Sequence, residues 1–325
     1  MEGKGMKSIY IYCPDLSGAD YRLVLERLGT DSVRNVTVHT DLPRKTTAKD
    51  IEALCEVQKE FSRKKRVRFK NIASFNEIPR FTRGLRRVLR KNGFTVDLNS
   101  KKEQAPRLVK VVRALGKAGI VHRLTVDERD DQLSVYGYFS SFGLHTNFKD
   151  PEYTAESPDH FDKWLYDASA RGINTYCDII NMLVMQTHSP NCRHASCFGN
   201  TFAVDGELNV YMCHAVKDET TLLGSLREKT SPAELFSCRA VGEILPAVVK
   251  KREGCMAGCK FFPYCQGGCP LRSDNDSDCA YYRATVDRIR ERLLEVYRDG
   301  KVRQVNYVVK NAILNALAFG TAFFD

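Results

Sequence analysis

Nine of the twelve cysteines in this chain lie between Cys192 and Cys279, which makes this stretch the clearest candidate for a site of chemistry. The densest run is Cys255, Cys259, Cys265 and Cys269, separated by three, five and three residues. Thiolates at such spacing converge on one soft metal centre, because the glycines and the proline between them let the backbone turn tightly. Disulfides are the alternative, but they are typical of short secreted chains, whereas this chain has 325 residues and shows no secretory segment. We therefore predict a metal or iron–sulfur site.

The number of cysteines indicates the number of centres. One cysteine, Cys238, stands alone between helical patterns, and setting it aside leaves eight in the stretch. A four-iron cluster takes four thiolates, so eight thiolates predict two clusters. Two structural zinc sites would use the same number, and the spacing by itself does not choose between iron and zinc.

The order of these cysteines resembles the SPASM domain, the two-cluster extension at the C-terminus of many radical S-adenosylmethionine (SAM) peptide-modifying enzymes. The resemblance rests on Cys197, Gly206 and Cys213, followed by the dense run and Cys279. The chain departs from the family pattern in two spacings, the six residues between Gly206 and Cys213 and the three between Cys255 and Cys259. The resemblance implies two 4Fe-4S clusters. It assigns the first to Cys192, Cys197, Cys213 and Cys269, and the second to Cys255, Cys259, Cys265 and Cys279.

The sequence before the cysteine-rich stretch predicts the strands and helices that would position these cysteines. Strand-like and helix-like segments alternate through the first half, which predicts parallel strands joined by helices. The expected strands are residues 8–13, 33–39, 67–72 and 94–98, and the expected helices are 21–28, one capped by Thr47, one opened by Pro79, and 106–119. The fold class is therefore α/β. The resemblance specifies a partial (β/α) barrel of radical SAM type, followed by a cysteine-rich SPASM domain with a β-hairpin and short helices.

Later segments extend this prediction. We expect an antiparallel pair at 124–128 and 133–139, a helix at 161–170, a strand at 175–185 and a type I′ hairpin turn at 204–208. Cys55 and Cys177 are expected in the core. The apolar segment 311–324 is expected to pack on the barrel or on another subunit. The expected domains are 1–186, a degenerate radical SAM-like barrel, 187–290, a SPASM-like iron–sulfur domain, and 291–325, a C-terminal helix and apolar tail.

The first half lacks the residues on which radical SAM chemistry depends. Family members hold their catalytic cluster on a Cys-x3-Cys-x2-Cys loop after the first strand, whereas the nearest segment here reads Cys13, Ser17 and Asp20. Nothing near 39–43 or 74–77 reproduces the family's Gly-Gly-Glu segment. A hydroxyl and a carboxylate are poor ligands for a soft iron cluster. We therefore expect no reductive cleavage of SAM by the usual route, and no catalytic residue can be assigned.

Composition restricts compartment and partners. Twelve cysteines without a targeting segment indicate a reducing cytoplasm, and no apolar stretch is long enough to span a membrane. Basic runs at 63–66 and 80–91 account for much of the net charge of +10, either as solvated faces or as a surface for an acidic peptide or protein. No nucleic-acid motif accompanies them. His188, His194 and His214 lie near the cysteines, and of these His194 is the alternative ligand to Cys192.

Three functional hypotheses remain open. The first is a degenerate radical SAM/SPASM protein, similar to maturases of CXXX-repeat peptides, that keeps two auxiliary clusters and binds a precursor peptide or relays electrons for a radical SAM partner enzyme. The second is an active maturase whose catalytic cluster forms at Cys13 with other ligands, including Cys55. The third is a binding module stabilised by zinc.

Overall fold

The computed structural model describes residues 8–13, 18–29, 33–126, 132–144, 146–148, 157–167, 175–185, 199–229, 231–269, 271 and 275–320. The chain forms two compact units, and each is assembled from separate stretches of sequence. The first unit contains residues 1–99, 110–122 and 197–246, and the second contains 100–109, 123–196 and 247–325. The predicted domains 1–186, 187–290 and 291–325 stay a prediction. No helix among the described residues is long and apolar enough to cross a membrane.

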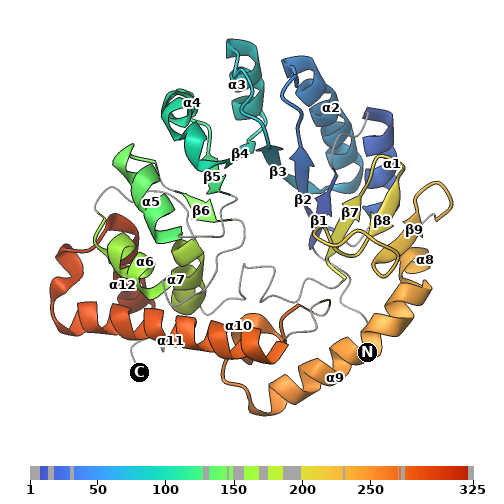
Figure 1. Cartoon of the computed structure of the whole chain (residues 1–325). Coiled ribbons are helices and arrows are strands. Elements are labelled where there is room, and N and C mark those ends of the chain that lie inside the picture. The colour runs from blue at the N-terminus through green and yellow to red at the C-terminus, as the bar shows by residue number, and fades with distance from the viewer. Residues whose placement is uncertain are drawn as a thin grey trace. The chain divides into compact units, whose positions relative to one another are not determined.

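A mixed sheet organises the first unit (Figure 1). Within the first unit, the strand order is β4-β3-β2-β1-β7-β8-β9. The pairs from β4 to β7 are parallel, and β7, β8 and β9 are antiparallel. The strands are β1 (Ser8–Tyr12), β2 (Asn35–Asp41), β3 (Arg68–Phe75), β4 (Thr95–Ser100), β7 (Thr201–Val204), β8 (Asn209–Tyr211) and β9 (Leu222–Ser225). The helices are α1 (Gly18–Leu28), α2 (Ala48–Lys65), α3 (Arg83–Lys91) and α8 (Pro232–Phe236).

Side-chain alternation and helix caps explain where several of these strands and helices form. Residues in β1 and β2 alternate between buried apolar side chains and half-buried polar or aromatic ones, the period of a strand with two unlike faces. Thr47 precedes α2 in a capping box with Asp50, whose carboxylate accepts the Thr47 backbone N–H at 2.7 Å. Helix α3 begins later than expected, because Thr82 and not Pro79 precedes its first turn and accepts the Leu85 N–H.

The second unit is mainly helical. It contains the short parallel pair β5 (His122–Val126) and β6 (Asn147–Phe148) and the 3-10 turns η1 (Lys102–Gln104) and η3 (Lys301–Arg303). Its helices are α5 (Gln132–Ser141), α6 (Ser157–Leu165), α7 (Thr175–Met185), α10 (Phe262–Cys265), α11 (Asn275–Arg298) and α12 (Tyr307–Phe319). Two further helices, α4 (Ala105–Lys117) and α9 (Arg239–Gly258), have residues in both units, and one end residue each of β4 and β5 belongs to the other unit.

The apolar C-terminal segment packs within the second unit. Helix α12 contacts α7 and α11. Asn306 fixes where it begins, because its side chain accepts the Val309 N–H at 3.1 Å and donates to the Trp164 carbonyl. Residues 321–324 of the predicted apolar segment lie outside the described residues.

Three local predictions were wrong. The segments expected as strands at 133–139 and 175–185 are helices α5 and α7, because a short apolar run without clear alternation fits a buried helix as well as a strand. The expected antiparallel pair is therefore absent there. The hairpin between β7 and β8 is confirmed, but its turn is not type I′: Leu208, with φ of 67°, is the left-handed residue, whereas Gly206 has no positive φ.

Candidate functional site

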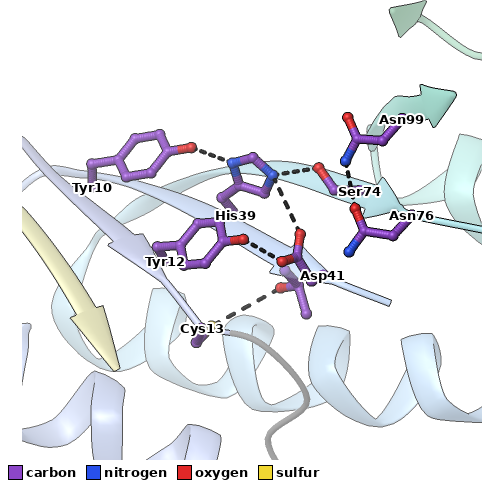
Figure 2. Close-up of polar contacts among 9 residues, drawn as sticks. Tyr10, Tyr12, Cys13, His39, Asp41, Ser74, Asn76 and Asn99 are labelled. Carbon is purple, nitrogen blue, oxygen red and sulfur yellow. Dashed lines mark hydrogen bonds and ion pairs between the residues drawn. The ribbon is translucent and has the colours of Figure 1, made fainter. Parts of the chain in front are cut away.

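Polar side chains gather at the carboxyl ends of the parallel strands in the first unit (Figure 2). Register explains their proximity, since Tyr12 on β1 lies beside His39 on β2, and Asp41 lies beside Ser74 on β3. Residues two apart on a strand share one face, so Tyr10 joins the same surface. We call Tyr10, Tyr12, His39, Asp41 and Ser74 the strand-end network. The carboxyl ends of strands are where open α/β sheets and barrels bind ligands.

Hydrogen bonds join the members of the strand-end network. The Tyr10 hydroxyl lies 2.5 Å from Nδ1 of His39, and the other ring nitrogen contacts the Ser74 hydroxyl. The Tyr12 hydroxyl donates to the Asp41 carboxylate. Burial, followed by this hydrogen bond and the charge of Asp41, raises the pKa of Tyr12 far above its ordinary value. Tyr12 therefore remains a protonated donor at neutral pH.

The loop after β8 reaches the same tyrosine. The ring of His214 lies 5.6 Å from the Tyr12 ring, and the Lys217 ammonium lies 5.0 Å from the Tyr12 ring centroid. Burial and the charge of Lys217 lower the pKa of His214, while the charge of Asp41 acts in the opposite direction. Nδ1 of His214 is buried and has no hydrogen-bond partner among the described residues.

Cys13, the first position of the degenerate cluster loop, has a buried side chain. Its side chain is 1% exposed, and its sulfur lies 4.0 Å from the Thr40 hydroxyl. Burial raises the pKa of this thiol to about 12, so at neutral pH it is not the thiolate that metal binding requires. Ser17 lies outside the described residues, and Asp20 lies in the first turn of α1. Cys55 is buried on α2, as predicted, and burial raises its pKa to about 11.

Four cysteines of the predicted second cluster gather in the second unit. Cys255 lies near the end of α9, Cys259 follows that helix, Cys265 ends α10, and Cys279 lies on α11. Burial raises the pKa of Cys265, and the charges of the other three thiols raise it further. Burial also raises the pKa of Cys279, and the charges of Cys255 and Cys259 add to this rise. The four sulfurs therefore lie within electrostatic reach of one another.

Backbone geometry turns the chain between these cysteines. Gln266, Gly267 and Gly268 all have positive φ, which reverses the chain immediately after Cys265. A Cβ at Gly267 would lie 3.2 Å from Cγ of Arg252, so a side chain there would be both strained and crowded. The sulfurs do not yet have ligand geometry, because no group of three or more His, Cys, Asp or Glu in the described part of the chain could hold a metal ion as it stands. The donor set nevertheless suits a soft centre, since it offers four half-buried thiols.

The predicted first cluster is only partly described. Cys213 follows β8 and is 5% exposed, and Cys269 is 7% exposed in the second unit. Cys192 and Cys197, together with His188 and His194, lie outside the described residues, so this ligand set stays a prediction. Cys238, which is not among the predicted ligands, directs its thiol at the Leu222 carbonyl, 3.8 Å away. The side chain of Cys177 lies outside the described residues too.

Comparisons with solved structures identify the fold, which is of the radical SAM/SPASM type. The structure "Native anSMEcpe with bound AdoMet", from an anaerobic sulfatase-maturating radical SAM/SPASM enzyme, is similar with a TM-score of 0.67 and 17% sequence identity over 88% of this chain and 99% of that chain. "Native anSMEcpe with bound AdoMet and Kp18Cys peptide" is similar with a TM-score of 0.68 and 17% identity over 90% and 99%. No protein-family model and no curated protein matches the sequence.

The match confirms the predicted α/β fold class and its radical SAM/SPASM type. The sequence alone did not predict the strand-end network. The available signal was the alternation of Tyr10 and Tyr12 with isoleucines in β1, and of His39 and Asp41 with Val38 and Thr40 in β2. Such alternation places polar groups together on one face.

Proposed function

We propose that this chain is an iron–sulfur protein that acts in the maturation of a ribosomally made peptide without cleaving SAM itself. It would bind the precursor peptide, or serve a radical SAM partner enzyme by relaying electrons. Two 4Fe-4S clusters would be held by the eight cysteines assigned above. The radical SAM/SPASM-type fold supports the general class, and the finer role is the proposal.

The gathering of Cys255, Cys259, Cys265 and Cys279 carries this proposal. The charges of neighbouring thiols in this set raise the pKa values of Cys265 and Cys279, although Cys279 is far from Cys255 in sequence. A bound four-iron cluster would supply one-electron transfer, tuned by nearby charges and hydrogen bonds. Burial raises the pKa of Cys279, and the positive charges of Lys251 and Arg283 oppose that rise. Cations beside a thiol favour the thiolate that a cluster needs.

The strand-end network supports the absence of SAM cleavage. Tyrosine, histidine, aspartate and serine side chains occupy the strand ends, and Cys13 is a buried, protonated thiol. Three convergent thiolates with a free iron site cannot come from this set. The network instead presents hydrogen-bonding groups on a half-buried face, which suits the binding of a polar ligand.

Peptide binding is supported by two of the similar structures, which are of anSMEcpe with bound Kp18Cys and Cp18Cys peptides. We transfer to this chain only the class of ligand. A radical SAM enzyme as a partner would supply the SAM chemistry that this chain lacks.

Anaerobic reconstitution followed by iron and sulfide analysis tests the cluster proposal. We expect about eight irons and eight sulfides per chain, since each four-iron cluster has four of each. About twelve irons would favour an active maturase with a third cluster at Cys13. Zinc without iron would favour the zinc-stabilised binding module.

A second experiment tests the chemistry directly. The reconstituted protein is mixed with SAM and a strong reductant, and 5′-deoxyadenosine is measured by chromatography. We expect none above the level of a reaction without protein, whereas an active radical SAM enzyme run in parallel produces it. Reproducible formation of 5′-deoxyadenosine that depends on this chain would overturn the proposal.

A further inference from the structure

A lysine from the chain itself lies on the strand-end network. Lys217, in the loop after β8, places its ammonium over the Tyr12 ring, and the hydroxyl of the same ring donates to Asp41. Lys217 is exposed, whereas the Tyr12 ring and Asp41 are half-buried. An aromatic face beside a carboxylate is an arrangement that attracts cations, because the ring quadrupole and the negative charge act in the same direction.

We propose that Tyr12 and Asp41 bind the cationic side chain of a lysine or arginine in a peptide, and that Lys217 occupies this place when no peptide is bound. This inference rests on the proposed function for its biological role, and it names the substrate class as a basic peptide. The binding itself needs neither SAM nor an iron–sulfur cluster.

Charges around the site favour a cation over an anion. Asp97 lies on the same register level as Asp41, with Ser74 between them, so two carboxylate-bearing residues lie on alternate strands of one level. Among the described residues, the histidine rings that pack against Tyr12 are His39 and His214. In the described part of the chain, the cation over this ring is the Lys217 ammonium.

Arginine fits this site better than lysine. Its planar guanidinium stacks on an aromatic ring and hydrogen-bonds a carboxylate through two donors, whereas an ammonium acts as a compact point charge. Tyr12 provides the ring, and Asp41 keeps one carboxylate oxygen that the tyrosine hydroxyl does not use, at 4.0 Å from His39. An arginine side chain that displaces Lys217 would therefore place a hydrogen-bond donor on this remaining oxygen.

A different role for Lys217 would be to recruit an anion, and substitution separates the two roles. If Lys217 is a placeholder, Lys217→Met tightens the binding of a cationic ligand because a competitor is removed. If Lys217 is an anion-binding residue, the same substitution leaves cation binding unchanged and abolishes anion binding. Lys64→Met is the matched control, because Lys64 is an exposed lysine on α2 that pairs with Glu60.

The test uses the full chain and two probes, N-acetylarginine amide and its uncharged counterpart N-acetylcitrulline amide. Binding is followed by NMR of histidine rings, with the His39 signal assigned from a His39→Asn spectrum. We expect the arginine probe to shift the His39 signal and the citrulline probe to leave it unchanged. Asp41→Asn, which still accepts the Tyr12 hydroxyl, should weaken arginine binding by about tenfold or more.

Three results would overturn the inference: equal binding of the two probes, unchanged affinity in Asp41→Asn, or Lys217→Met that does not tighten binding relative to Lys64→Met. Far-UV circular dichroism of each variant confirms that it folds. The outcome is separate from the fate of the proposed function. If the protein holds about eight irons but does not bind the arginine probe, the cluster proposal stands and this inference fails. If it binds the probe but holds no iron, this inference stands and the cluster proposal fails.

Discussion

Cys13 and Cys55 are buried thiols whose ionisation opposes folding. Burial removes water from the thiolate, which raises the pKa of Cys13 from 9.0 to about 12 and that of Cys55 from 9.0 to about 11. Cys255, Cys259, Cys265 and Cys279 are only half-buried. Burial thus separates core cysteines from candidate ligands, a distinction that residue type alone does not make.

The raised pKa of Cys13 predicts a loss of stability in alkali. As pH rises above 9, the unfolded thiol ionises while the folded thiol stays protonated, so stability that is complete below pH 9 is lost between pH 9 and 12. Between pH 8 and pH 10 the loss from this group is about 1.4 kcal/mol. Denaturant unfolding of the reduced protein at both values measures it. Cys13→Ala should lose less stability over this interval by that amount, and an equal loss would contradict the assigned burial.

Cysteine substitution predicts two different effects on iron content. Cys265→Ala removes a thiolate from the gathered set and should lower the reconstituted iron by about half, since one of two clusters is lost. Cys55→Ala should leave iron unchanged, because Cys55 is 3% exposed and lies on the buried face of α2. Iron analysis after anaerobic reconstitution measures both. A fall in iron with Cys55→Ala would favour the active maturase with ligands drawn from the core.

At the scale of elements, helix α12 shows how an apolar segment is accommodated. One face, with Val309, Ile313 and Ala316 buried, packs in the second unit, where α12 contacts α7. The opposite face leaves Tyr307, Leu314 and Leu317 exposed. The helical period therefore divides the apolar residues between a packed and an open side.

Neighbouring positions on α12 should respond very differently to truncation. Ile313→Ala should lower the free energy of unfolding by about 2–4 kcal/mol, because it leaves a cavity where a 1% exposed side chain was packed. Leu314→Ala, at a position 47% exposed, should change it by about 0.5 kcal/mol or less. Denaturant unfolding measures both. Equal effects would show that the buried face of α12 is assigned wrongly.

At the scale of the whole molecule, the two halves of the sequence share one sheet. Strand β7, from residues 201–204, pairs with β1 in parallel, with Ile11 beside Phe202. Both residues are fully buried. Removal of the second half therefore exposes the edge of β1 and its apolar neighbours, which is the condition for edge-to-edge aggregation.

A chain cut at the predicted boundary should reveal this dependence. The fragment 1–186 should aggregate or unfold without cooperativity, because it lacks β7, β8 and β9, and co-expression with the fragment 187–325 should restore soluble material. Size-exclusion chromatography and thermal unfolding measure the outcome. A soluble, monomeric and cooperatively unfolding 1–186 would instead support an independent first domain.

The sequence predicted what local signals encode. Strands β1 to β4 and the helices between them follow from alternating β-branched residues and from caps such as Thr47. The resemblance of the cysteine order to the SPASM domain implied the radical SAM/SPASM-type fold that the similar structures confirm. The hydrophobic period failed to distinguish helix from strand in α7, because the run from Ile179 to Val184 is largely apolar and buried.

Residue types by themselves determined the class of fold, the thiol-rich donor set and the absence of a catalytic cluster loop. Tertiary structure decided which groups meet. Tyr10 and His39 are 29 positions apart, and His39 and Ser74 are 35 apart, yet strand register places them in hydrogen-bond contact. The pKa of Cys13 was likewise decided by burial. The physical reason is that contact and desolvation depend on distance in space, which a linear sequence specifies only through the fold.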